Sequence, residues 1–424
     1  MNFFFKINNT IQNITVNNNQ KKFFLLIFIL EFFLIAFIIK ILSINIPLHS
    51  HIVRDILTIQ HTPLSKIFFS DLNYSLLDSR IIYKENFLDA LFYNSFHYDK
   101  EIISNQWVGN NGYVYFAFFF IKTLFFIPPF LAVVFLHAAI HFLLCFNIIL
   151  YLKKKLRFYF VMFYFLNPFV VYFIIYPNHY FLLSISGFIA LRAYLVSKHS
   201  IKEVVLSSII LLSVFFTRSA AIGFVLAYVI ILIYKKSPHL KYALIIFFLS
   251  VSVYSFSKTE NINRIWHTVF AGYHAYKRDN QLMLDDNIYN LVYSTNKDFK
   301  KKPDTFTQEY LDSVKELVLY KLENDKITFV KNFIFNSFSI FSFGYKFNNH
   351  YYLKLFNVFI GFLLFFLFFS QFPFLTFLIY IIELPWIFYY PPIVGYRFGT
   401  LILLSYLLTI TLNKIFSKKS NNTI

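Results

Sequence analysis

Long apolar runs separated by short cationic connections constrain the fold more than any other feature of the sequence. The first run covers residues 23–48, follows Lys21 and Lys22, and has no small-residue cleavage site after it. Nine further runs cover residues 130–152, 158–175, 180–197, 204–216, 220–234, 242–256, 355–372, 374–390 and 398–412. A membrane-spanning helix needs about 20 mostly apolar residues. The sequence therefore predicts an all-α polytopic membrane protein with about ten transmembrane helices, the first of them an uncleaved anchor.

The composition excludes a water-soluble protein. Of the 424 residues, 58% are hydrophobic and only 14% are charged, and the mean hydropathy is +0.58. A soluble protein averages about 45–50% apolar and about 25% charged residues, so this chain has too few charges to cover a wetted surface. Cys145 is the single cysteine, so no disulfide forms within the chain.

The charges are distributed according to membrane sidedness. Lys and Arg occur three times before the first run, four times in residues 153–157, and three times each in residues 192–202, 235–241 and 414–419, against one acid, Glu203. Short cationic connections stay in the cytoplasm. The net charge of +18 therefore reflects contact with a membrane rather than with nucleic acid. Both termini are expected in the cytoplasm of a bacterium, with the chain in its inner membrane.

Successive predicted helices cross the membrane in opposite directions, and the short cationic connections between them are cytoplasmic. Two long polar segments, residues 49–111 and 257–352, are therefore expected on the outer side of the membrane. The organisation expected is one membrane domain over residues 23–412, between cytoplasmic tails 1–22 and 413–424, with outer loops at about 49–129 and 257–353. The apolar stretch 112–129 is long enough to cross, but a crossing would move the later basic clusters outside. It is therefore expected at the outer interface or as a re-entrant helix that ends at Pro128 and Pro129.

The second outer segment contains its own amphipathic helix. Thr305 and Gln308 have the spacing of a capping box. Apolar residues then recur at helical spacing, at Leu311, Val314, Val318 and Leu322. The apolar piece that follows, residues 329–343, is expected to return along the membrane surface.

Missing motifs narrow the possible functions. The chain has no Walker loop, no G-x-G-x-x-G after a strand and no sizeable cytoplasmic domain. These absences argue against a nucleotide-driven pump and against a cytoplasmic enzyme that uses nucleotide sugars. An enzyme with this layout would work at the outer face on a substrate delivered within the bilayer.

Several segments resemble those of one family of membrane enzymes. They are SHIVRDILTIQ after the first run, WVGNNGYVYFAFFFIKTLF, YFLNPFVVYFIIYPNHYFLLSISGFIALRAYLVS, LSVFFTRSAAIGF, IWHTVFAGYHAYKRDN, KNFIFNSFSIFSFG and YYPPIVGYRFGTLILLSYLL before the last run. Together they are similar in layout to the GT-C glycosyltransferases, the superfamily of protein O-mannosyltransferases and lipid A aminoarabinose transferases. The resemblance covers nearly the whole chain, and it lies in the layout rather than in sharp motifs.

The resemblance implies an inverting glycosyltransferase. Such an enzyme moves a sugar from a polyprenyl-phosphate donor to a lipid, glycan or protein acceptor at the periplasmic face. It would carry no organic cofactor. A divalent metal is possible, because the superfamily includes both metal-dependent and metal-independent members.

The chemistry of such a transfer needs a carboxylate and cations at interfacial depth. Asp55, seven residues past the first run, would accept the acceptor's proton. Arg218 and Arg397, the basic residues of the short outer turns, would hold the departing phosphate. The family often has an acid at the turn that contains Pro177; this chain has none, and His179 is the possible substitute.

Each candidate also has a purely structural interpretation. Asp55 is next to Arg54, and the two could form a solvated ion pair at the end of a helix. Arg218 and Arg397 could extend their side chains to lipid headgroups. Tyr396, a possible ligand beside Arg397, suits the aromatic belt of a membrane protein.

Two features within the apolar runs leave other functions open. His137 and His141 share one helical face, a spacing that can bind metal but is more typical of a pair in the bundle interior. Glu31 and Glu383 are intramembrane acids, expected to pair with each other, with Lys40 or with Lys122. The alternatives to a transferase are a polymerase or ligase of surface polysaccharide, and a lipid-linked-sugar flippase or transporter.

Overall fold

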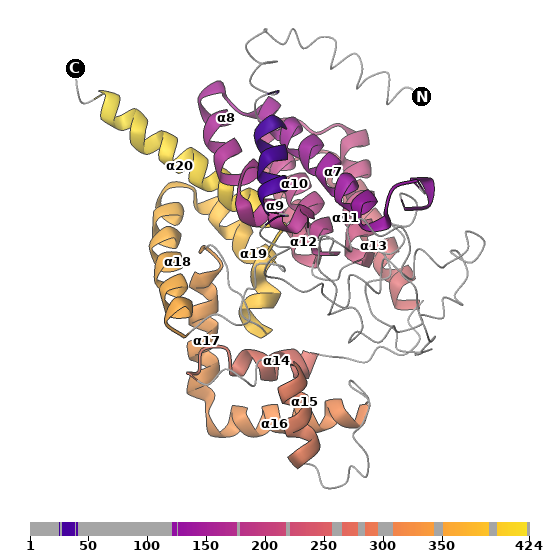
Figure 1. Ribbon diagram of the computed structural model, residues 1–424, viewed down its shortest axis with the longest axis vertical. Helices are drawn as coiled ribbons and strands as arrows, with labels where there is room; N and C mark the ends of the chain where they lie inside the picture. Colours follow the sequence, from indigo (N-terminus) through magenta and orange to yellow (C-terminus); the bar gives the residue numbers. More distant parts are fainter. Residues whose placement is uncertain are drawn as a thin grey trace.

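The computed structural model describes residues 25, 28–38, 40, 121–124, 126–175, 179–217, 221–256, 265–278, 285–295, 308–342, 351–389 and 397–421. Throughout these residues the regular elements are helices and no strand occurs, so the predicted all-α class is confirmed for the part described. Asp55, Arg218 and Tyr396 lie outside it, as does most of the stretch 112–129. Figure 1 shows the arrangement of the helices.

The first helices form one side of the bundle. Helix Phe28–Ile38, part of the predicted anchor, is drawn in indigo in Figure 1. Helix α7, Pro129–Tyr151, begins directly after Pro128, and Pro129 at its first position lacks the N–H that would otherwise be unsatisfied there. The two prolines therefore start the spanning helix, close to the predicted boundary at residue 130.

The predicted span at residues 158–175 is broken into three pieces. Helix α8, Lys154–Phe160, continues into a π-helical turn η2, Val161–Phe165, and helix α9, Pro168–Ile175, follows at an angle of 49°. Asn167 stabilises the break: its amide donates to the Phe163 carbonyl at 3.0 Å, and its side-chain oxygen accepts from the Phe169 amide at 3.0 Å. Pro168 cannot continue the helical hydrogen bonds, which explains why the bend occurs here.

The central helices follow the predicted spans closely. They are η3 His179–Phe181, α10 Leu182–Leu195, α11 Ile201–Thr217, α12 Ile222–Tyr234 and α13 Leu240–Phe256. Helix α10 packs against α11, α12 and α20, and helix α11 packs against α13. The main apolar core lies between these helices, and α10 is in its middle.

The second polar segment forms a separate helical layer. It contains α14 Ile265–Tyr273, α15 Asp285–Thr295 and α16 Gln308–Asn324. Leu311, Val314 and Val318 are buried in a second apolar core with residues of α14 and α15, and Leu322 is partly buried there. The predicted amphipathic helix is therefore confirmed from Gln308 onward, and Thr305 lies outside the described residues.

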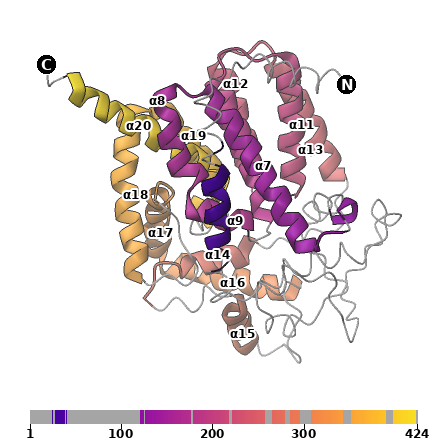
Figure 2. The ribbon, with the colours of Figure 1, turned by 45° about the horizontal axis from the view of Figure 1, so that its top comes forward.

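The chain then returns to the bundle through α17 Lys326–Ser339, α18 Tyr351–Gln371, α19 Pro373–Tyr389 and α20 Leu401–Asn421. Helix α17 lies lengthwise beside α18, as both views show (Figures 1 and 2). A Cβ atom on Gly361 of α18 would lie 2.0 Å from the Phe338 carbonyl oxygen of α17, so the two helices approach closely. Residues 329–343, which were expected to return along the membrane surface, lie for the most part in α17, and α17 packs against α18 and α19.

Few helices are long enough to cross a membrane without a break. By length and composition, two helices qualify among the described residues, Phe130–Tyr151 and Tyr351–Gln371, and a third if the bent pair around Asn167 forms one span. Six shorter apolar helices accompany them: Phe28–Ile38, Leu182–Leu195, Ile222–Tyr234, Leu240–Ser250, Pro373–Phe388 and Leu401–Ile415. Large apolar side chains such as Phe248, 74% exposed, cover their outer surfaces. This pattern is consistent with membrane association.

The two ends of the bundle differ in character. The cationic connections gather at one end, where Arg192 contacts Tyr151, Lys235 lies over the Tyr194 ring, and Lys414 lies over the Phe372 ring. The layer α14–α16 covers the opposite end, as Figure 2 shows. The segregation of charge seen in the sequence therefore corresponds to two opposite ends of the folded molecule.

The corner between α16 and α17 depends on Asp325. Its Oδ1 accepts from the Thr328 amide at 3.3 Å and its Oδ2 accepts from the Tyr273 hydroxyl. The hydrogen bonds from Tyr273 and Thr328 hold the pKa of the Asp325 carboxyl below its ordinary value. Burial, followed by the bond to Asp325, raises the pKa of Tyr273 to about 12, so the phenol stays a donor at neutral pH.

We predict that this corner loosens in acid. Because the folded-state pKa of Asp325 is lowered, its contribution to stability is complete above the unfolded pKa of about 4 and is lost as the pH falls through the folded value. Hydrogen exchange at the Thr328 amide should therefore lose protection in acid. In the Asp325→Asn variant, which keeps a capping oxygen but does not titrate, protection should be independent of pH in this range; an identical acid response in the two proteins would contradict the assignment.

Candidate functional site

Arg397 occupies the turn that leads into α20, and it has no exposed surface. Two glycines allow this turn to lie directly against α10. A Cβ atom on Gly187 would lie 1.9 Å from the Gly399 carbonyl oxygen, and one on Gly399 would lie 2.2 Å from the Leu183 carbonyl oxygen. Only residues without a side chain fit at these two positions, so the turn is held inside the bundle rather than at its surface.

The guanidinium of Arg397 caps the C-terminal end of α17. Its Nη1 donates to the carbonyls of Ser339 at 3.3 Å and Ser342 at 3.1 Å, and its Nη2 donates to the Ile340 carbonyl. The last carbonyls of a helix have no partner within the helix and carry partial negative charge. Arg397 thus donates to three carbonyls at and just after the end of α17, and the Ser339 carbonyl also accepts from the Ser342 amide and hydroxyl.

Glu383 of α19 faces the same guanidinium from the other side. Its Oε1 lies 3.9 Å from Arg397 Nε, and the side chain of Glu383 is 1% exposed. Within the described residues, Arg397 Nε makes no hydrogen bond, and the Thr400 hydroxyl lies beside the Glu383 carboxylate. A buried ion pair is costly, since each charge has lost its water. Such a pair inside an apolar bundle is a candidate functional group.

A layer of buried polar side chains surrounds this pair and connects it to α14. The Tyr276 hydroxyl donates to Asn336 Oδ1 at 2.8 Å and lies 3.3 Å from Ser339 Oγ, while Asn336 Nδ2 donates to the Ile387 carbonyl at 3.2 Å. Burial raises the pKa of Tyr276 above its usual value, so it remains a neutral donor. The turn that follows α14 is therefore joined to α17, and α17 to α19, by specific hydrogen bonds at this level.

Lys354 of α18 extends the layer. It has no exposed surface, and its Nζ donates to the Ala275 carbonyl at 2.8 Å. Asn332 of α17 donates to the carbonyls of Gly272 and Tyr273 at 2.9 Å and 3.0 Å. Together with Arg397, Glu383, Tyr276 and Asn336 these groups form a polar junction between the outer helical layer and the apolar bundle. We name this set the Arg397 junction.

A second buried polar cluster lies on α7. His137 and His141 are fully buried, which confirms that the pair faces the bundle interior. His137 stacks on Phe181 with ring centroids 4.0 Å apart, and His141 Nε2 lies 3.8 Å from Glu31 Oε1. No group of three metal-ligating side chains occurs among the described residues.

The structure describes only part of the predicted site. Arg397 is the one predicted residue whose side chain it places; of His179 it describes the backbone, at the start of η3. Arg397 does not extend to the headgroups, because it is completely buried. Whether Asp55, Arg218 and Tyr396 gather beside it lies outside the described residues.

The pairing of the intramembrane acids differs from the expectation. Glu383 faces Arg397, and Glu31 faces His141. Glu383 and Arg397 are only 14 residues apart in the sequence, but this spacing alone does not predict their contact. Nothing in the sequence indicated that Tyr276, Asn336 and Lys354 would join them, because these residues come from three distant segments.

Comparison of the chain with models of protein families, with curated proteins and with solved structures finds no match to any of them. The family resemblance of the sequence therefore rests on layout alone, and the function must be argued from the residues.

The Arg397 junction makes a prediction about stability. Removal of one partner of a buried ion pair costs about 3–5 kcal/mol, because the other charge is left uncompensated. Arg397→Gln should reach this range, since it also releases the carbonyls that end α17. Glu383→Gln should cost clearly less, because the Arg397 hydrogen bonds to Ser339, Ile340 and Ser342 persist. Thermal or denaturant unfolding of the purified variants in detergent measures both, and equal losses would exclude the capping role.

Proposed function

We propose that the protein is an integral membrane glycosyltransferase with about ten spans in a bacterial inner membrane. It would move a sugar from a polyprenyl-phosphate donor to a lipid, glycan or protein acceptor at the periplasmic face. The apolar helices and the cationic end opposite the layer α14–α16 support this orientation. Both termini are then cytoplasmic, and the outer layer is periplasmic.

The Arg397 junction is the observation that carries the proposal. Its central residue, Arg397, belongs to the segment YYPPIVGYRFGT, which resembles the closing motif of the family, and Arg397 donates to carbonyls at and just after the end of α17. A transferase that uses a lipid-linked donor needs a rigid polar framework at the depth where the lipid phosphate meets water. Buried charges are otherwise rare in an apolar bundle, because they cost free energy to desolvate.

In this mechanism each residue has a separate task. The Asp55 carboxylate accepts the proton of the acceptor as the acceptor oxygen forms a bond to the anomeric carbon. The bond between that carbon and the donor phosphate breaks, and polyprenyl phosphate leaves with the negative charge. Arg218 stabilises this charge. Arg397, with its Nη atoms bonded to main-chain carbonyls, acts as a positioning residue that holds the turn before α20 in place.

A lipid-linked-sugar flippase is the second candidate, and one observation favours it. Glu31 and His141 face each other within the apolar bundle, 3.8 Å apart, as the titratable groups of a transporter would. The two functions differ in their product. A transferase forms a new glycosidic bond, whereas a flippase moves the donor across the bilayer unchanged.

The transferase predicts that Asp55 is essential for transfer. Loss of a general base lowers the rate by about 10²–10⁴-fold. Asp55→Asn should therefore lose at least about 10²-fold of transfer while the protein is still expressed and inserted. Asp99→Asn, a matched change in the same outer segment, should remain active. Mass analysis of lipids and surface glycans from strains that carry each variant provides the measurement and also identifies the sugar. Full transfer by the Asp55→Asn protein would remove the catalytic assignment.

The orientation makes an independent prediction. Reporter fusions at Asn73 and Asn296 should both report a periplasmic location, because the two outer segments contain most of the acids and no short cationic connection. A fusion at Lys198 is the matched control and should report the cytoplasm. A cytoplasmic signal at either asparagine would contradict the proposed orientation.

A further inference from the structure

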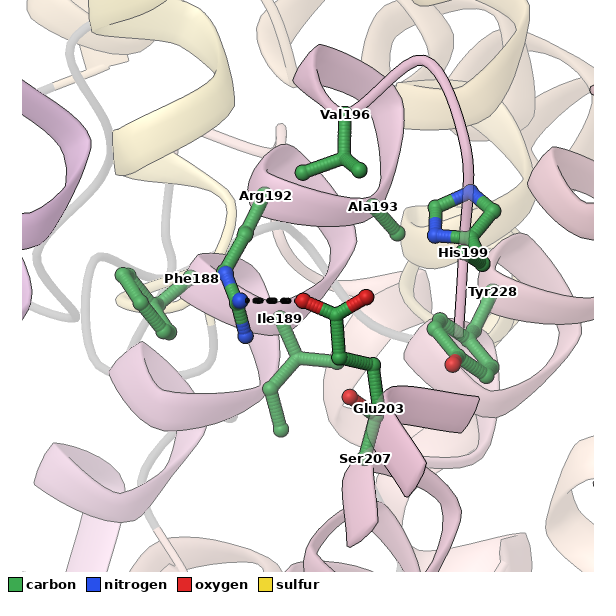
Figure 3. Close-up of a pocket in the computed structure, with 9 residues that line it drawn as sticks. All are labelled: Phe188, Ile189, Arg192, Ala193, Val196, His199, Glu203, Ser207 and Tyr228. Atoms are coloured by element: carbon green, nitrogen blue, oxygen red, sulfur yellow. Dashed lines mark hydrogen bonds and ion pairs between the residues drawn. The ribbon is translucent and has the colours of Figure 1, made fainter. Parts of the chain in front are cut away.

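A small pocket lies at the cationic end of the bundle, far from the Arg397 junction. It opens between the end of α10 and the start of α11, and Figure 3 shows the side chains that surround it. The polar residues of its wall are Arg192, His199, Glu203, Ser207 and Tyr228. The cavity, measured with a water-sized sphere, has a volume of about 20 Å³, and about 10–15 Å³ on this measure holds one water molecule. The pocket therefore fits a single small polar group rather than a whole molecule.

The acid of this pocket is already engaged. Glu203 Oε1 accepts from Arg192 Nη2 at 2.7 Å, and Glu203 Oε2 accepts from the amide and hydroxyl of Ser200 at 3.1 Å and 3.2 Å. The Ser200 hydroxyl in turn accepts from the Glu203 amide at 3.3 Å, which completes a capping box at the start of α11. Both carboxylate oxygens therefore have partners within the protein, and the acid does not point to a cation ligand.

Two nitrogen atoms of the pocket, in contrast, lack a hydrogen-bond partner within the part of the chain that the structure describes. Arg192 Nε and His199 Nε2 are buried, and neither has a hydrogen-bond partner among the described residues. A buried donor without an acceptor is costly. An arginine can only donate. The unmet requirement of the pocket is thus for an acceptor atom, such as an oxygen.

The electrostatic field at the pocket is positive. The titratable groups that act on His199 are Glu203, Lys235, Arg192 and His239, and two of these are fixed cations against one acid. Lys198 and Lys202 lie in the same connection, and Lys235 extends over the Tyr194 ring at 5.3 Å. Burial is the main cause that lowers the pKa of His199, so its ring is neutral at pH 7 and adds a polar contact without charge. An anionic oxygen matches this surface best.

We propose that this pocket binds a phosphate group, with one phosphate oxygen accepting from Arg192 Nε. The pocket lies at the end that carries the short cationic connections, where a phospholipid headgroup would reach it. Free inorganic phosphate offers the same acceptor oxygens as a phospholipid headgroup. The experiment below distinguishes these two ligands. This site is independent of the proposed transferase, since it lies at the opposite end of the bundle.

Two variants that break the same ion pair test the site. Arg192→Gln and Glu203→Gln both remove the contact between Arg192 and Glu203, but only the first removes the anion donor. The full-length proteins are reconstituted in nanodiscs of phosphatidylcholine, with or without phosphatidylglycerol. Native mass spectrometry then measures the retained lipid. In a second arm, thermal unfolding is measured in pure phosphatidylcholine nanodiscs with added inorganic phosphate.

The wild type should retain phosphatidylglycerol preferentially, or be stabilised by inorganic phosphate. Arg192→Gln should weaken this binding about tenfold, the effect of losing one charge-assisted hydrogen bond. Glu203→Gln should bind as well as the wild type or better, because it removes a negative charge. Lys153→Gln, a change of the same charge at this end but outside the pocket, should have little effect.

Four results would overturn the proposal. If Arg192→Gln and Glu203→Gln lost phosphate binding equally, the ion pair would matter only for structure. Loss in Glu203→Gln alone would show a cation site. A loss in Lys153→Gln equal to that in Arg192→Gln would show general surface charge. No response of the wild type to either phosphatidylglycerol or inorganic phosphate would show that the pocket holds only water. Retention of phosphatidylglycerol identifies the headgroup as the source, and a response to inorganic phosphate alone identifies a soluble anion.

Discussion

The rest of the structure depends on the complete burial of one guanidinium group. Arg397 has lost all contact with water, and its charge is compensated by three carbonyls at the end of α17 and by Glu383 of α19. Since an uncompensated charge in an apolar interior is very unfavourable, these partners must keep their places. The glycines at 187 and 399 allow the turn to reach this position, and the packing of α10, α17, α19 and α20 follows from it.

Two helix ends and one bend lie beside buried polar groups. Helix α17 ends and α20 begins at the level of Arg397, and the bend at Asn167 interrupts a third element. In a bilayer, helix ends are stable only where their free carbonyls and amides have partners, because no water is present to satisfy them. Arg397 and Asn167 supply such partners within the protein. Interrupted helices supported by buried polar groups are common at substrate sites of membrane proteins, which is why this level of the bundle is the most informative for function.

The two ends of the molecule are built differently. At one end, a helical layer with its own apolar core meets the bundle through Tyr276, Asn336 and Lys354. At the other end, Arg192 and its neighbours form a small cationic pocket between α10 and α11. The proposed transfer from a lipid-linked donor at the first end and the proposed phosphate site at the second are compatible, because both surfaces of a bilayer carry lipid phosphate groups.

The sequence by itself determined the all-α class, the positions of most helices and the separation of charge between two ends. These properties depend on local patterns: apolar length, helical spacing as in Leu311 and Val314, and the count of lysines in short connections. The bend at Asn167 and the inward position of α17 depended on contacts between distant segments. So did the pairing of Glu383 with Arg397, because a buried charge takes whichever partner the packing brings near. Only the tertiary structure decided these, since sequence spacing carries no information on which helices become neighbours.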